Sequence, residues 1–178
     1  MINIEPPPHG SSVIDLNQWF YSVYRVFTQR IADLLMLSTT TFSNAAGSGD
    51  TDMATYTLSP ESLFANGQFL TIEGFGTFAA NGNTKRIRIV FGSTTVFDTG
   101  NVTDNSGAWK ITLNLFRTAA SVQKYEGCYF SNGGGQSLSY GTGTENFSVA
   151  NTVKFVGNGL SVSDVVQEGM TIKWNPVA

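Results

Sequence analysis

Glycine and proline are distributed so unevenly along this chain that they divide it into two parts. Three prolines at positions 6–8 and a glycine at position 10 open the sequence, neither residue type occurs from residue 11 to residue 46, and glycines then recur every few residues. Both residue types interrupt helices and favour tight turns. We therefore expect a helix in the N-terminal part and a turn-rich β structure in the longer remainder.

Residues 12–35 carry the pattern of an amphipathic helix. Ser12, followed three residues later by Asp15, matches a capping box in its acidic form. One apolar stripe recurs at spacings of three and four: Leu16, Phe20, Val23, Phe27, Ile31 and Leu34. Further large apolar residues lie on the flanking faces: Trp19, Tyr21, Tyr24 and Val26. Because a lone helix cannot bury two faces, we predict that the stripe forms an oligomer interface. The short repeat does not fix how many helices the oligomer contains.

Beyond the helix the apolar period changes from 3.6 to two. Residues 37–52, rich in Ser, Thr, Asn and Gly, have no clear period and are interpreted as a linker. From residue 53 onward apolar and polar residues alternate, as in Trp109, Ile111, Leu113 and Leu115 against Lys110, Thr112 and Asn114. We thus expect three parts: an N-terminal arm and helix (1–36), a linker (37–52) and a β domain (53–178).

Turn signals separate the alternating segments of the β domain. Asn66-Gly67, Asn81-Gly82 and Asn132 with its three following glycines supply the positive φ angles of tight hairpins. This spacing predicts about eight or nine strands. The predicted fold class is mainly β: an antiparallel β-sandwich, jelly-roll-like, preceded by an N-terminal amphipathic α-helix. The strand order stays open, since sandwich and jelly-roll topologies share these local signals.

Charge and cysteine content exclude several classes of function. Charged residues make up only 13% of the sequence and the formal net charge is −3. Nucleic-acid binders need clustered Lys and Arg to displace counterions, so we expect no nucleic-acid partner. Cys128 is the only cysteine, which excludes an intrachain disulfide and indicates folding in a reducing cytoplasm. With no signal-peptide pattern and no apolar run of ~18 residues, we expect no membrane insertion.

One long stretch carries a family resemblance: LFANGQFLTIEGFGTFAANGNTKRIRIVFG (Leu63 to Gly92), continued by Gly107-Ala-Trp-Lys-Ile111 and Arg117-Thr118. It resembles a β-sandwich module of virion proteins of tailed bacteriophages, over roughly residues 53–178. In that family the module is an exposed appendage of head fibres, capsid decoration proteins or tail fibres, usually as a homotrimer.

The resemblance implies a non-enzymatic structural protein of the virion, made in the cytoplasm of a host bacterium. We expect a trimeric head fibre or capsid decoration protein anchored by its N-terminus. The alternative is a tail-fibre or receptor-binding module that recognises a host surface glycan or protein.

The first residues are interpreted as an arm that docks onto a phage capsid or tail protein. Its members are Ile2, Ile4, Pro6, Pro7, Pro8 and His9. Three consecutive prolines favour an extended, stiff conformation that suits a groove in a neighbouring protein. The only histidine, His9, lies in this arm, so neither a catalytic triad nor a histidine metal site is expected. We predict no catalytic residue, metal or cofactor.

The β domain also contains carboxylates and one cysteine that could carry chemistry. Seven carboxylates are candidates for a glycosidase pair: Glu73, Asp98, Asp104, Glu126, Glu145, Asp164 and Glu168. Nothing in their spacing selects two of them, so we interpret them as scattered charges. Cys128 lies among aromatic residues and is expected in the core.

Candidate ligand contacts in the β domain are basic or aromatic. Arg86 and Arg88 share one face of a predicted strand, where they suit an anionic glycan or a capsid contact. Tyr125, Tyr129 and Tyr140 flank glycine-rich segments and are candidates for stacking on a sugar. Trp109 and Trp174 lie on apolar faces and are expected to be core residues.

Overall fold

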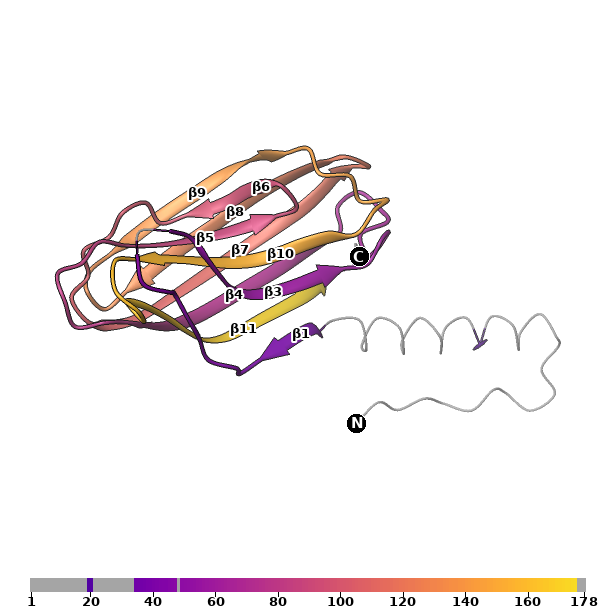
Figure 1. Cartoon of the computed structure of the whole chain (residues 1–178). Helices are drawn as coiled ribbons and strands as arrows, with labels where there is room; N and C mark the ends of the chain where they lie inside the picture. Colours follow the sequence, from indigo (N-terminus) through magenta and orange to yellow (C-terminus); the bar gives the residue numbers. More distant parts are fainter. Residues whose placement is uncertain (1–18, 21–33, 48, 176–178) are drawn as a thin grey trace. The chain divides into compact units, whose positions relative to one another are not determined.

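The computed structural model describes residues 19–20, 34–47 and 49–175, and the chain divides into two units, Met1–Asp33 and Leu34–Ala178 (Figure 1). In the first unit Trp19 and Phe20 are described. Both have helical backbone, and their ring centroids lie 5.0 Å apart. The attachment arm and the rest of the helix stripe up to Ile31 lie outside the described residues, so the helix and its oligomer interface stay predictions.

The second unit consists of two antiparallel sheets (Figure 1). The larger sheet has the order β1-β11-β4-β7-β8-β9, with β2 also paired to β11. Its strands are β1 (Leu34–Ser38), β2 (Phe42–Ser43), β4 (Phe69–Phe78), β7 (Gly107–Ala119), β8 (Val122–Ser131), β9 (Gln136–Gly143) and β11 (Val165–Asn175). The smaller sheet, in the order β3-β10-β5-β6, contains β3 (Thr51–Leu58), β5 (Lys85–Phe91), β6 (Thr94–Asp98) and β10 (Asn151–Gly159).

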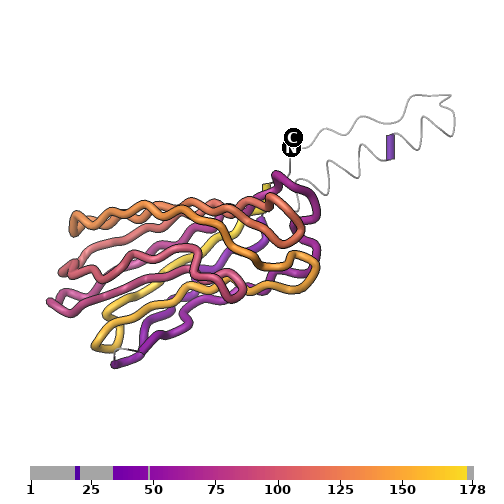
Figure 2. The backbone as a smooth tube through the Cα atoms, turned by 90° about the horizontal axis from the view of Figure 1, so that it is seen from above, coloured from indigo at the N-terminus to yellow at the C-terminus, as the bar shows by residue number. Residues whose placement is uncertain are grey.

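The two sheets enclose one hydrophobic core, and their strands run along a common direction (Figure 2). The alternation seen in the sequence decides which side chains enter it. The inward residues of β7 are at most 2% exposed: Trp109, Ile111, Leu113 and Leu115. Ile87, Ile89 and Phe91 of β5 face them from the smaller sheet and are fully buried. The predicted mainly-β fold of antiparallel sheets in a sandwich-like arrangement is therefore confirmed.

The N-terminal edge of the sandwich differs from the prediction. Leu34–Ser38 form strand β1, although the helix pattern extends through Leu35 and the linker was placed at 37–52. β1 pairs with β11, and Leu35 and Met36 pack against the core. Because this pairing partner lies more than 130 residues away in the sequence, the local period of three and four is overridden here. The helical interface therefore cannot include Leu34, and the division between the units falls at Asp33/Leu34.

A buried polar cluster holds the loop that leads into β5. Lys85 is fully buried, and its Nζ donates hydrogen bonds to the carbonyl oxygens of Asn81, Asn83 and Asp104 at 3.0, 3.1 and 3.0 Å and to Oδ1 of Asn81 at 3.1 Å. Asp164, also fully buried, accepts from Asn81 Nδ2 at 2.6 Å and from the Ser161 N–H at 2.7 Å. Each buried charge is thus surrounded by partners, which is the condition for keeping it in a core.

Candidate functional site

The outer face of the larger sheet is where polar groups and exposed rings come together. Antiparallel register aligns its outward side chains in rows that cross the strands. One row contains Glu73, Thr112, Cys128 and Leu138; the next contains Thr71, Asn114, Glu126 and Tyr140; a third contains Phe75, Lys110, Phe130 and Gln136. We call these twelve residues the outer face. They come from four neighbouring strands, β4, β7, β8 and β9.

A chain of hydrogen bonds, which we call the polar ladder, runs across this face. Asn175 Nδ2 donates to Oγ1 of Thr71 at 3.1 Å, Thr71 Oγ1 donates to Oδ1 of Asn114 at 3.0 Å, and Asn114 Nδ2 donates to Oε1 of Glu126 at 3.3 Å. Each side chain is therefore oriented by its neighbour, while Glu126 remains exposed at the end of the ladder. Oriented polar groups on a rigid sheet lose little conformational freedom when a ligand binds.

Glu73 is the second fixed polar group of the face. Lys110 Nζ lies 3.0 Å from its carboxylate and donates to it, and Lys173 Nζ lies 3.9 Å away. The hydrogen bond from Lys110 holds the pKa of Glu73 below its usual range, so this carboxylate is ionised at neutral pH. The outer face and its immediate border carry Lys110, Lys124 and Lys173 against Glu73, Glu126 and Glu168, and these charges balance.

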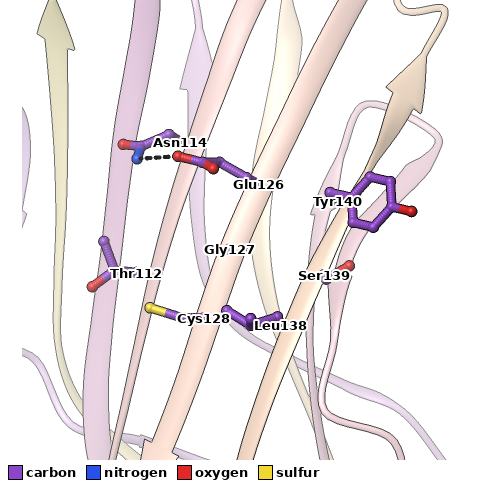
Figure 3. A pocket seen from close by; sticks show the side chains of 8 residues that line it. All are labelled: Thr112, Asn114, Glu126, Gly127, Cys128, Leu138, Ser139 and Tyr140. Carbon is purple, nitrogen blue, oxygen red and sulfur yellow. Dashed lines mark hydrogen bonds between the residues drawn. The ribbon is translucent and has the colours of Figure 1, made fainter.

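Large apolar side chains border the polar ladder. Phe75 is 48% exposed, Phe130 56%, Leu138 86% and Tyr140 88%. A hollow of about 280 Å³ lies between β7, β8 and β9 and is bordered by Thr112, Asn114, Glu126, Cys128, Leu138 and Tyr140 (Figure 3). A second hollow lies between Phe75 and Phe130, with Lys110 and Glu168 at its border. Exposed apolar side chains that gather on one face mark interaction sites or ligand-binding grooves.

The structure separates the three predicted tyrosine contacts. Tyr140 lies on the outer face, but Tyr125 points to the inner side of β8 and packs against the core. Tyr129 is 1% exposed, so its predicted contact with a ligand is wrong for this structure. Its hydroxyl donates a 2.9 Å hydrogen bond to Oδ2 of Asp104, and burial raises its pKa. Both faces of β8 carry aromatic residues, which is why the sequence alone did not choose between them.

The two predicted arginine contacts lie on the solvent-facing side of the smaller sheet, and Tyr140 belongs to the larger sheet. Arg86 is paired with Asp98, and Arg88 is paired with Asp50. On the same face Lys154 Nζ lies 2.6 Å from Oδ2 of Asp52. The positive charge that we expected to attract an anion is therefore already compensated within the chain.

Cys128 and the two tryptophans complete the comparison with the sequence. Cys128 is only partly buried and faces outward from β8, so its expected core position is wrong. Trp109 is 2% exposed, as expected, and Trp174 is partly buried against the core. The sequence did not single out Phe75, Phe130, Asn114 or Leu138 as site residues. For Phe130, the signal in the sequence was the alternation along β8, which places Lys124, Glu126, Cys128 and Phe130 on one face of the strand.

The candidate carboxylates are distributed among separate hydrogen-bond networks. Asp98 binds Arg86, Asp104 accepts from Tyr129, and Glu145 accepts from Ser93 N and Oγ at 2.8 and 2.7 Å. Among residues 19–20, 34–47 and 49–175, no group of three or more His, Cys, Asp or Glu side chains could hold a metal ion. Within the same ranges no helix is long and apolar enough to cross a membrane.

Comparisons with known proteins give no close relative. No protein-family model matches the chain, and no curated protein matches it.

Among solved structures, the CBM2 module of the evolved Dit of Lactobacillus casei BL23 phage J-1 is 11% identical, over 77% of this chain and 76% of that chain, with a TM-score of 0.40. Peanut lectin with a nine-residue peptide is 8% identical over 80% and 92%, with a TM-score of 0.37. The CBM36-1 domain of a multidomain xylanase from the hindgut metagenome of Trinervitermes trinervoides is 12% identical over 78% and 98%, with a TM-score of 0.28. All three TM-scores are low, and we infer the function from this chain's own residues.

Proposed function

We propose that this chain is a non-enzymatic binding module of a phage particle, and that the outer face of its larger sheet binds a neutral glycan of the host surface. The observation that carries this proposal is the polar ladder from Asn175 to Glu126, which ends beside the exposed ring of Tyr140 on the same sheet face as Phe75 and Phe130. The virion assignment itself comes from the sequence resemblance.

The chemistry of a sugar fits both parts of the face. The C–H face of a pyranose ring is apolar and packs on an aromatic ring such as Phe130 or Tyr140. Its hydroxyl groups need donors and acceptors held in fixed directions, which Glu126 and Asn114 supply. Because the lysine and glutamate charges on and beside this face balance, the face has no net charge to attract an anionic or cationic glycan, which favours a neutral one.

Binding without catalysis is supported by the state of the carboxylates. Glycoside hydrolysis requires two carboxyl groups flanking the bond, one of them with a raised pKa so that it can donate a proton. On the outer face the pKa of Glu73 is lowered, because Lys110 donates a hydrogen bond to its carboxylate. Such a group holds its charge and orients neighbours, and it does not act as a general acid.

The test is a binding measurement with fragments of host envelope glycans, by array and then by calorimetry on the best binder. We expect Phe130→Ala and Tyr140→Ala each to weaken binding about tenfold, equivalent to roughly 1.4 kcal/mol for the loss of one stacked ring. The matched control is Phe64→Ala, since Phe64 is 64% exposed but lies in the loop between β3 and β4. Equal loss in the control, or no glycan bound by the wild-type chain, would overturn the proposal. Release of reducing sugar would show an enzyme instead.

A second proposal concerns assembly and attachment. We infer that residues 1–33 trimerise the chain and dock it on the capsid, as in a head fibre or decoration protein, with a tail fibre as the alternative location. The apolar stripe from Leu16 to Ile31 and the division of the chain after Asp33 favour this role. A charge in the stripe would be buried at great cost, so Phe20→Asp with Phe27→Asp should reduce the mass in sedimentation threefold. An unchanged mass would rule the trimer out.

A further inference from the structure

Strand β9 forms one edge of the larger sheet. It pairs with β8 over eight consecutive residues, from Gln123↔Gly143 to Phe130↔Gln136, with no shift in register. On its other side it is hydrogen-bonded to no strand among residues 34–47 and 49–175. β6 of the smaller sheet lies close to it across the sandwich without joining it. The row of backbone N–H and C=O groups that points away from β8 is therefore available to another strand.

β9 lacks the features that protect a sheet edge. Natural edges are kept from pairing by charges, prolines, bulges or short length. Residues 136–143 contain no charged residue and no proline, and the nearest charge along the chain is Glu145. A neutral edge of this length without a bulge is a template for strand addition.

The other edges of the described sandwich are all protected. β1 and β6 have five residues each, and both show a register shift, while β2, which shares the β11 edge with β1, has only two residues. β6 also carries Asp98, which binds Arg86. The pairing of β3 with β10 shifts in register between Phe155 and Val156, and β3 carries Asp52, which is paired with Lys154. The contrast singles out β9 as the edge that the fold leaves open to a partner.

We propose that β9 pairs antiparallel with β9 of a second copy of this chain, so that the larger sheet continues across two subunits. A second copy is the occupant because the neutral strand does not repel itself, and because antiparallel pairing of identical strands generates a two-fold axis that closes the contact at two copies. The two largest exposed apolar fractions of the described residues lie on this strand, 86% for Leu138 and 88% for Tyr140. Self-pairing brings each of them against a side chain of the partner.

The register follows from these side chains. With Ser139 opposite the partner's Ser139, Leu138 lies directly opposite the partner's Tyr140, and the reverse pair forms across the axis. Directly opposed residues have Cβ atoms about 4.5–5.5 Å apart, close enough for an aliphatic and an aromatic side chain to pack. Because the axis is perpendicular to the sheet, both outer faces point the same way. The hollow beside Leu138 and Tyr140 of one subunit then lies next to the same hollow of the other subunit, so that the two proposed ligand-binding faces lie side by side.

Charge substitutions in the full-length chain test the pairing and its register together. In Leu138→Lys with Tyr140→Lys, like charges lie directly opposite each other, which disfavours pairing. In Leu138→Lys with Tyr140→Glu, the same register places each lysine opposite a glutamate. We expect the wild-type chain and the Lys/Glu variant to have twice the sedimentation mass of the Lys/Lys variant. The contribution of residues 1–33 is the same in all three proteins.

Two results would overturn the pairing. One is equal mass of the wild-type chain and the Lys/Lys variant at every concentration; the other is loss of association in the Lys/Glu variant as well. In the single chain both side chains are mainly in water, so thermal unfolding of the variants at dilutions where every protein is dissociated at β9 should match the wild type and serves as the check on folding. The inference does not depend on glycan binding, because Phe130→Ala is expected to weaken glycan binding and leave the mass unchanged.

Discussion

Asn114 on β7 donates a 3.3 Å hydrogen bond from Nδ2 to Oε1 of Glu126 on β8 (Figure 3), and its own Oδ1 accepts from Thr71 on β4. One amide thus uses both of its ends to connect three neighbouring strands. This makes Asn114 the central member of the polar ladder, and it orients the carboxylate that lies beside the exposed ring of Tyr140.

Removal of this amide should affect ligand binding more than folding. Asn114→Ala leaves the Glu126 carboxylate free to rotate and removes one donor from the face. We expect the dissociation constant for a bound glycan to rise about tenfold, or roughly 1.4 kcal/mol, while the free energy of unfolding falls by about 1 kcal/mol. Calorimetric titration and urea unfolding measure the two effects. The control is Asn101→Ala, at an exposed asparagine away from the outer face, which should change neither the dissociation constant nor the free energy of unfolding. If Asn114→Ala lowers the free energy of unfolding without weakening binding, Asn114 has only a structural role.

Lys85 should be among the strongest single contributors to stability. Lys85→Met keeps the length of the side chain but leaves four buried oxygen atoms without their donor, which costs on the order of 3 kcal/mol. Lys154→Met breaks a partly exposed ion pair and should cost under about 1 kcal/mol. Urea unfolding of both variants gives the comparison, and equal losses would show that the Lys85 ammonium is not held as described.

Asp164 should make stability depend on pH in the acid range. Burial alone would raise its pKa, but hydrogen bonds from the Ser161 N–H, Asn81 and Asn83 together lower it. In the unfolded chain the group titrates near its ordinary pKa of about 3.9. Its contribution is complete above that pH, and it is lost as the pH falls through the lowered folded pKa, because the unfolded state takes up the proton first.

The measurement is the free energy of unfolding of the wild type and of Asp164→Asn from pH 7 to pH 3. We expect the wild type to lose more free energy than the variant below about pH 4. Parallel curves would mean that Asp164 has the same proton affinity in both states.

Gly74 of β4 lies against the ring of Phe155 of β10, across the space between the two sheets. A Cβ there would lie 2.4 Å from Cε1 of Phe155, which is too close for any side chain unless the ring moves. We expect Gly74→Ala to destabilise the fold by about 1–3 kcal/mol through overpacking. A Cβ at Gly82 meets nothing within 4 Å, so Gly82→Ala should be close to neutral. The difference in thermal midpoint between the two variants tests this, and similar midpoints would argue against the close approach.

Part of the candidate site could be found from the sequence. The alternation along residues 107–119 predicted that Lys110, Thr112 and Asn114 share one face, and the structure places them there. Tyr140 was predicted as a ligand contact and is on the same face. Tyr129 and Cys128 were assigned to the wrong sides, because β8 has aromatic or apolar groups on both faces and a shift by one residue exchanges them.

What the sequence determined by itself was local. Turn glycines and the period of two decided that the chain after residue 53 forms strands, since both signals act over a few residues. What only the tertiary structure decided was which strands meet: that Leu34–Ser38 pairs with β11, that β9 stays at an edge, and that Lys85 is enclosed by oxygen atoms from two loops. These outcomes depend on partners tens of residues away, whose approach is set by burial of the whole core and by no short pattern.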